Sequence, residues 1–127
     1  MRAGDTFRFA DRRLEPHLWV VISDPLIDVA DPVVIVRLTT HRPSRDGTCV
    51  LQPGDHPFIT HETVVDYEEA LEISNPGLDG FVGQGLAFLQ EPVSPEVLSR
   101  IRQGAAVSPR IPEGCREILI RHGLIEP

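Results

Sequence analysis

Hydrophobic residues in the first half of the chain follow patterns that are typical of short β-strands. Residues 5–9 alternate between polar and apolar positions, so Phe7 and Phe9 share one face of a strand. Residues 17–23 and 32–40 are apolar, β-branched runs bounded by turn residues, which predicts two further strands. Shorter apolar stretches predict strand segments at 48–51, 63–65 and 70–74, the last two forming either separate strands or one kinked strand. Because no helical pattern separates the early strands, βαβ units are excluded and a small barrel or sandwich is favoured.

The last third of the chain has the periodicity and the terminal residues of helices. Ser94 is a good N-cap for a helix over residues 94–102, and Gly104 follows as its expected C-terminal glycine. A second helix is predicted over residues 113–122 and is closed by Gly123. The fold class predicted from these patterns is therefore α+β.

Residues 77–89 contain four glycines, which predicts a bent loop between the strands and the helices. These glycines do not complete a known phosphate-binding motif. We find no repeat and no long linker, so we expect one domain over residues 1–127. Its β part covers about residues 1–75, and the loop and C-terminal helices cover about residues 76–127.

Composition agrees with a single globular domain, with 41% hydrophobic and 24% charged residues among 127. The net charge of −7 is unevenly distributed: residues 1–50 hold seven arginines and seven acids, whereas residues 51–127 hold five arginines and twelve acids. This acidic total excludes a protein that coats nucleic acid through basic clusters. A small site that handles one or two phosphates remains possible, and we expect it in the N-terminal half.

Location follows from the apolar runs and the cysteines. The longest apolar runs, at 18–22 and 33–36, are far shorter than the roughly 20 residues of a membrane helix. The N-terminal residues lack the apolar stretch of a signal peptide, and Cys49 and Cys115 fit a reduced pair. We therefore expect a cytoplasmic protein without a membrane partner.

Histidines are the most informative candidates for chemistry. Four of the five fall within 45 positions of the β half: His17, His41, His56 and His61. They can be ordinary polar residues at strand ends, or His56 and His61 can bind a metal with Asp55 and Cys49. They can also act as acid and base on a phosphate or a 2′-hydroxyl without a metal. The loose spacing of the four possible metal ligands matches no known metal-binding motif, so we expect no metal and no cofactor.

The third interpretation gains support from the residues beside the histidines. His17 begins one predicted strand, and Thr39 and Thr40 end the next. If these two strands are antiparallel neighbours, the start of one meets the end of the other. We then expect a single phosphate-binding patch composed of Arg12, Arg13, His17, Thr39, Thr40, His41 and Arg42.

The same strands resemble the PemK/MazF family of toxin endoribonucleases. Residues 4–9 resemble the opening strand of that family, residues 17–23 its next strand and residues 34–40 the strand that follows, with a weaker match at 61–67. The resemblance covers about residues 3–75. It implies a small SH3-like β-barrel with C-terminal helices. It also implies a toxin that cleaves single-stranded RNA by attack of the 2′-hydroxyl on the adjacent phosphate, is inhibited by an antitoxin protein and forms a homodimer.

In this register the catalytic arginine of the family falls on His17, and its catalytic threonine or serine falls on Thr39, with Thr40 beside it. The change from arginine to histidine implies either paired-imidazole chemistry, with His41 or His61 as the second group, or loss of activity. We expect catalytic roles for His17, Thr39 and Thr40. The residues expected to bind substrate are Arg12, Arg13, His41, Arg42 and His61.

An alternative function is a catalytically inactive SH3-like barrel that binds a protein or a nucleic acid. The acidic second half of the chain favours this alternative, and so does His17 in the place of the family's catalytic arginine. The predicted helices also carry more apolar residues than one face of a small barrel needs, which predicts a dimer or hetero-complex formed through them. These residues are Val97, Leu98, Ile101, Ile118, Leu119 and Ile120.

Overall fold

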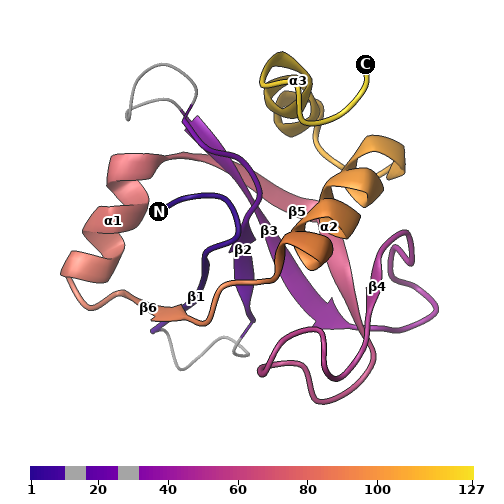
Figure 1. Cartoon of the computed structure of the whole chain (residues 1–127), viewed down its shortest axis with the longest axis horizontal. Helices are drawn as coiled ribbons and strands as arrows, with labels where there is room; N and C mark the ends of the chain where they lie inside the picture. The colour runs from indigo at the N-terminus through magenta and orange to yellow at the C-terminus, as the bar shows by residue number, and fades with distance from the viewer. Residues whose placement is uncertain (11–16, 26–31) are drawn as a thin grey trace.

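A computed structural model describes residues 1–10, 17–25 and 32–127. These residues form strands and helices in one α+β arrangement (Figure 1), which confirms the predicted fold class. The strands are β1 (Thr6–Phe9), β2 (Trp19–Val21), β3 (Pro32–Thr40), β4 (Val50–Leu51), β5 (Thr63–Ser74) and β6 (Ala87–Gln90). The helices are α1 (Asn75–Gly83), α2 (Pro95–Val107) and α3 (Glu113–Arg121).

All strand neighbours pair antiparallel in the order β4-β5-β3-β2-β1-β6. In the described part of the chain β4 and β6 are the two edges, so the pairing forms an open sheet and does not close it into a barrel. The expected SH3-like barrel is therefore not seen in the strand pairing, whereas the expected antiparallel pairing of β2 with β3 is confirmed.

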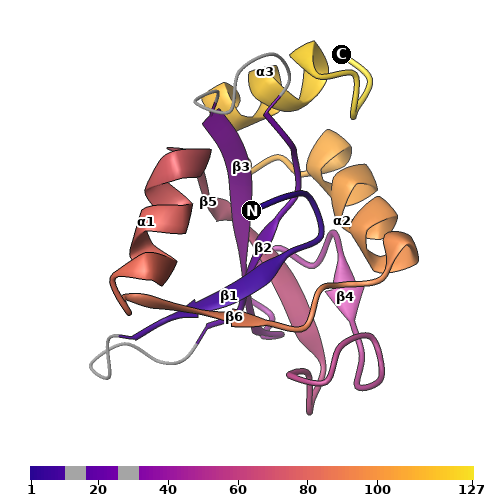
Figure 2. The same cartoon turned by 60° about the vertical axis from the view of Figure 1, so that its left-hand side comes forward.

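The two faces of the sheet bury separate hydrophobic cores, because side chains alternate along each strand. Leu18 and Val20 lie in the larger core with Ile101 of α2 and Leu119 of α3. On the other face, Phe7, Val21, Val33 and Ile35 pack with Leu78 of α1. Figure 2 shows the result: α1 lies on one side of the sheet, and α2 on the other.

The apolar region after residue 60 forms one long strand, β5, which matches the kinked-strand alternative. Its register against β3 shifts: Ile35 pairs with Leu71, but Arg37 pairs with Asp66. The extra residues of β5 in this interval include Tyr67, which is fully buried and donates a hydrogen bond of 2.7 Å from its hydroxyl to the backbone oxygen of Ile101. The irregular stretch of β5 is thereby attached to α2.

The prediction that Gly104 follows the first C-terminal helix is wrong. Helix α2 runs from Pro95 to Val107, and Gly104 lies inside it. A Cβ atom at Gly104 would come within 2.1 Å of the Tyr67 hydroxyl, so the glycine allows α2 to approach the sheet closely. This requirement comes from a residue far away in the sequence, which is why the local pattern suggested a helix end.

The bent loop predicted for residues 77–89 is also wrong, because this segment contains most of α1 and most of β6. Ser74 is the N-cap of α1, and its Oγ accepts a 3.2 Å hydrogen bond from the Gly77 N–H. Proline in the first turn adds a second start signal. These two signals outweigh the low helix propensity of the glycines.

Most of the helical residues expected to form a dimer contact are buried within this chain. Val97, Ile101, Ile118 and Leu119 belong to the larger core, so the argument for a contact through the helices does not hold. The exposed large apolar side chains of the described residues are Leu71, Leu86, Phe88, Leu89 and Val107. Three of them lie in or next to β6.

No helix in the described ranges has both the length and the apolar character needed to cross a membrane.

Candidate functional site

His17 lies where β2 begins and β3 ends. The backbone of Leu38 donates to Leu18 over 2.8 Å, which places the start of one strand beside the end of the other. The Nδ1 atom of His17 lies 3.1 Å from the backbone oxygen of Leu38. Because a carbonyl oxygen only accepts, Nδ1 carries a proton, and in the neutral ring Nε2 is free to accept one.

His61 reaches the same place from the other side of β3. It comes just before β5, and its Nε2 lies 2.9 Å from the Oγ1 of Thr40. The hydroxyl of Thr63 donates a 3.0 Å hydrogen bond to the backbone oxygen of His61, which fixes the turn that carries the ring. The β3–β5 ladder, in which Thr40 pairs with Thr63, therefore sets the position of the second imidazole.

These side chains enclose a cavity of about 360 Å³. The polar part of the lining contains both imidazoles and three threonines, of which Thr39 is only 6% exposed. The apolar part contains a phenylalanine. The lining residues are His17, Leu38, Thr39, Thr40, Phe58, Ile59, His61 and Thr63. Phe58 and Ile59 were missed by the sequence argument, since they come from the connection between β4 and β5, which has no motif of its own. Leu38 and Thr63 lie in predicted strands but were not assigned to the site.

Two described residues of the expected patch, His41 and Arg42, do not line the cavity. His41 makes a hydrogen bond through Nδ1 to the carboxylate of Glu62, which also accepts 3.1 Å from the Gln52 amide. These two hydrogen bonds, that of Gln52 first, lower the pKa of Glu62. Arg42 is exposed in a turn closed by Arg45. Arg12 and Arg13 lie outside the described residues.

Two other arginines lie near this end of the sheet. Arg37 donates to the buried Asp66 carboxylate over 2.6 Å, and an Arg45 nitrogen lies 3.6 Å from the same oxygen. Two guanidinium groups thus share one carboxylate, which leaves a net positive charge two residues before Thr39 on β3.

The proposed metal ligands point to different partners. His56 is buried and accepts the Phe58 N–H at Nδ1 over 3.0 Å, while its Nε2–H donates to the backbone oxygen of Glu91. Asp55 accepts from the Gln52 N–H and from Arg100. Within the described ranges, no three His, Cys, Asp or Glu side chains are grouped to hold a metal ion. Burial raises the pKa of the Cys49 thiol, which disfavours the thiolate that metals prefer.

Comparison of the sequence with models of known protein families gives no match, and comparison with curated proteins gives none either. The resemblance to PemK/MazF toxins therefore rests on the strand motifs alone. What the protein does has to be argued from the chemistry of the cavity that contains His17 and His61.

Proposed function

We propose that the cavity between β2, β3 and the start of β5 cleaves single-stranded RNA without a metal ion. The observation that carries the proposal is the presence of two imidazoles, those of His17 and His61, in the lining of one cavity together with threonine hydroxyls. Imidazoles exchange protons near neutral pH, so one can act as base while the other acts as acid.

In the proposed reaction, Nε2 of His17 removes the proton from a ribose 2′-hydroxyl. The 2′-oxygen then forms a bond to the adjacent phosphorus, and the bond from phosphorus to the 5′-oxygen breaks. The Thr40 hydroxyl gives its proton to that leaving oxygen and receives one from Nε2 of His61, 2.9 Å away. The products are a 2′,3′-cyclic phosphate and a 5′-hydroxyl. The hydroxyl of Thr39 donates to a non-bridging phosphate oxygen, which stabilises the developing charge.

The biological role that accompanies this activity is a toxin of the PemK/MazF type. In this role the protein is related to SH3-like barrels, is located in the cytoplasm, forms a homodimer and is inhibited by an antitoxin protein. The order and spacing of the strand motifs support it, and so does the pairing of the strands that carry His17 and Thr39. The antitoxin is expected to cover the cavity that contains these two residues.

The test of the activity is to incubate purified protein with a mixed-sequence RNA, with and without EDTA. We expect cleavage under both conditions and products that end in 2′,3′-cyclic phosphate. A single-stranded DNA of the same sequence should stay intact, because it lacks the attacking hydroxyl. Intact RNA, or cleavage that EDTA abolishes, contradicts the proposal.

A second candidate function is a binding module without catalysis. The observation that favours it is the apolar edge at β6, where Leu86, Phe88 and Leu89 are each about half exposed. An edge strand offers unpaired backbone groups, to which a strand of a partner protein can add. RNA binding at about 50 and 200 mM salt separates the two functions, since phosphate contacts weaken steeply with salt and an apolar edge does not.

A further inference from the structure

The apolar side chains that line the cavity, those of Leu38, Phe58 and Ile59, have no role in the proton transfers described above. We infer that the ring of Phe58 is the platform on which one base of the substrate stacks, so that the cavity takes a single unpaired nucleotide. This inference rests on the proposed function and specifies which part of an RNA the site recognises.

The cavity lining contains both kinds of group that a nucleotide needs. The sugar and phosphate need hydroxyl and imidazole groups, whereas the base needs an apolar surface of aromatic character. Phe58 is half-buried: part of its side chain packs against the larger hydrophobic core, and part lines the cavity. Of the eight lining residues it has the only ring on which a base can stack through its π-face, other than the two imidazoles assigned to the reaction.

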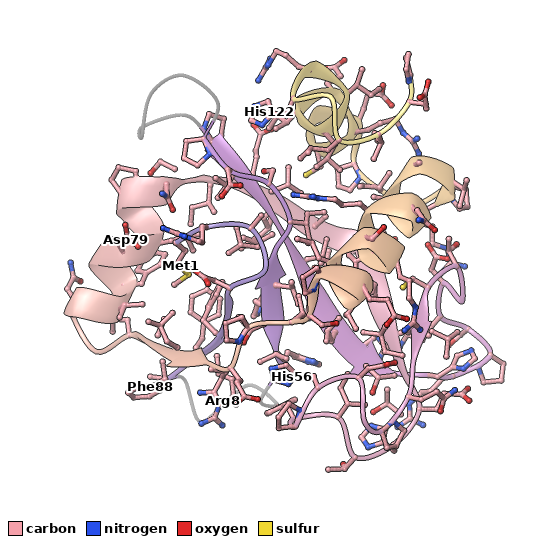
Figure 3. The ribbon with its side chains drawn as sticks, viewed as in Figure 1. Met1, Arg8, His56, Asp79, Phe88 and His122 are labelled. Atoms are coloured by element: carbon pink, nitrogen blue, oxygen red, sulfur yellow. The ribbon has the colours of Figure 1, made fainter. Side chains whose placement is uncertain are left out.

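The position of Phe58 is fixed by a buried histidine. Nδ1 of His56 accepts the Phe58 N–H over 3.0 Å, and Nε2–H donates to the backbone oxygen of Glu91. The Thr6 hydroxyl of β1 donates to that same oxygen over 2.7 Å. Figure 3 shows His56 in the interior at the lower end of the sheet. The backbone of Phe58 is therefore attached to the sheet, and a fixed aromatic ring loses little entropy when a base stacks on it.

Size restricts the occupant further. A volume of about 360 Å³ lies at the lower end of the range of roughly 300–1,000 Å³ that is usual for ligand cavities. This volume is of a size to take one nucleotide. Bases in a duplex are already stacked and paired, so only a single-stranded or unpaired nucleotide presents its face to Phe58.

The test uses a short single-stranded RNA with the fluorescent base 2-aminopurine at one position. It is bound to His17→Gln protein, the parent of the variants below, in which cleavage should be about 10²–10⁴-fold slower. Stacking quenches this fluorophore, so we expect its emission to fall on binding at one position of the label. Adding Phe58→Leu should abolish the quench and weaken binding about 5- to 150-fold, since it removes one base–aromatic contact. Phe58→Tyr should preserve both.

Phe81→Leu is the matched control, because it makes the same change in the core on the opposite face of the sheet. It should bind and quench as the parent does, and melting temperatures show that each variant is folded. Unchanged affinity and quench in Phe58→Leu overturn the inference. If the wild type still cleaves RNA in that case, the proposed function stands without the platform. If the His17→Gln protein does not bind the RNA and the wild type does not cleave it, both the inference and the proposed function fail.

Discussion

The Nδ1 atom of His17 lies 3.1 Å from the backbone oxygen of Leu38, across the gap between β2 and β3. Since the oxygen can only accept, this contact selects the tautomer with the proton on Nδ1. It also fixes the plane of the ring and leaves Nε2 as the atom that exchanges protons. A backbone carbonyl thus orients the ring of His17, as a carboxylate orients the histidine of a catalytic triad.

Replacing His17 with Gln should reduce RNA cleavage about 10²–10⁴-fold, because an amide cannot act as a base. The Gln amide can still donate to the Leu38 oxygen, so the melting temperature should change by less than about 5 °C. His17→Arg, which restores the residue of the resembled family, should recover part of the activity. Initial rates on a labelled RNA provide the measurement.

The matched control for that variant is His122→Gln, a histidine at the end of α3 that does not line the cavity. It should cleave RNA at the rate of the wild type. Equal rates in the His17 and His122 variants would remove His17 from the mechanism.

Replacing His61 with Gln should produce a loss of similar size, because its contact with Thr40 supplies the proton for the leaving group. The double variant His17→Gln, His61→Gln should be scarcely slower than either single variant, since residues that act in one step are not additive. Single-turnover rates of the four proteins measure this. If the double variant loses a factor in rate equal to the product of the two single losses, the histidines act independently.

Asp46 should make the stability of the fold depend on pH in the acid range. Burial alone raises the pKa of Asp46, but hydrogen bonds from Ser108 and Thr48 outweigh it and hold the pKa below its ordinary value of 3.8. A lowered folded-state pKa means that the stabilisation is present above 3.8 and is lost as the pH falls through the folded-state value. Asp46→Asn should therefore cost about 1 kcal/mol at neutral pH, a figure reduced for partial exposure.

Urea unfolding of the wild type and of Asp46→Asn at a series of pH values measures this difference. It should shrink steadily below about pH 4. A difference that stays constant down to pH 2 would show that the charge of Asp46 contributes nothing, and that the variant acts only through lost packing.

Gly104→Ala should destabilise the protein by about 1–3 kcal/mol, because its methyl group would overlap the Tyr67 hydroxyl. Tyr67→Phe in the same protein should restore part of the loss by removing that oxygen. Gly80→Ala in α1 is the matched control: its Cβ would meet nothing within 4 Å, so the change should stabilise the helix by about 0.5–1 kcal/mol. Additive effects of the Gly104 and Tyr67 substitutions would contradict the steric argument.

The sequence could predict those features that depend on residues close together in the chain. The proximity of His17 and Thr39 could be predicted because each lies at the end of a strand with a clear hydrophobic pattern. The antiparallel pairing of β2 with β3, which brings these ends together, is confirmed. His61 was also expected at the site, but its contact with Thr40 depends on the pairing of Thr40 with Thr63, which no local pattern shows.

Other features depended on contacts between distant residues. Phe58 enters the cavity because buried His56 holds its backbone, and nothing near it in the sequence indicates that Glu91 accepts from the other ring nitrogen. Gly104 has the appearance of a helix end until Tyr67 is known to occupy the space beside it. The glycines of residues 77–89 hid a helix because their low propensity was weighed without the Ser74 cap.

The open β6 edge has a consequence for how the protein behaves at high concentration. Residues 87–90 carry no charge and no proline, which are the devices that usually keep exposed strands from pairing between molecules. Repulsion between copies then depends on the overall charge of −7. That charge vanishes near pH 5.1 and is screened by salt. Acidification toward this value should bring the molecules together edge to edge, and turbidity should rise well before the fold is lost.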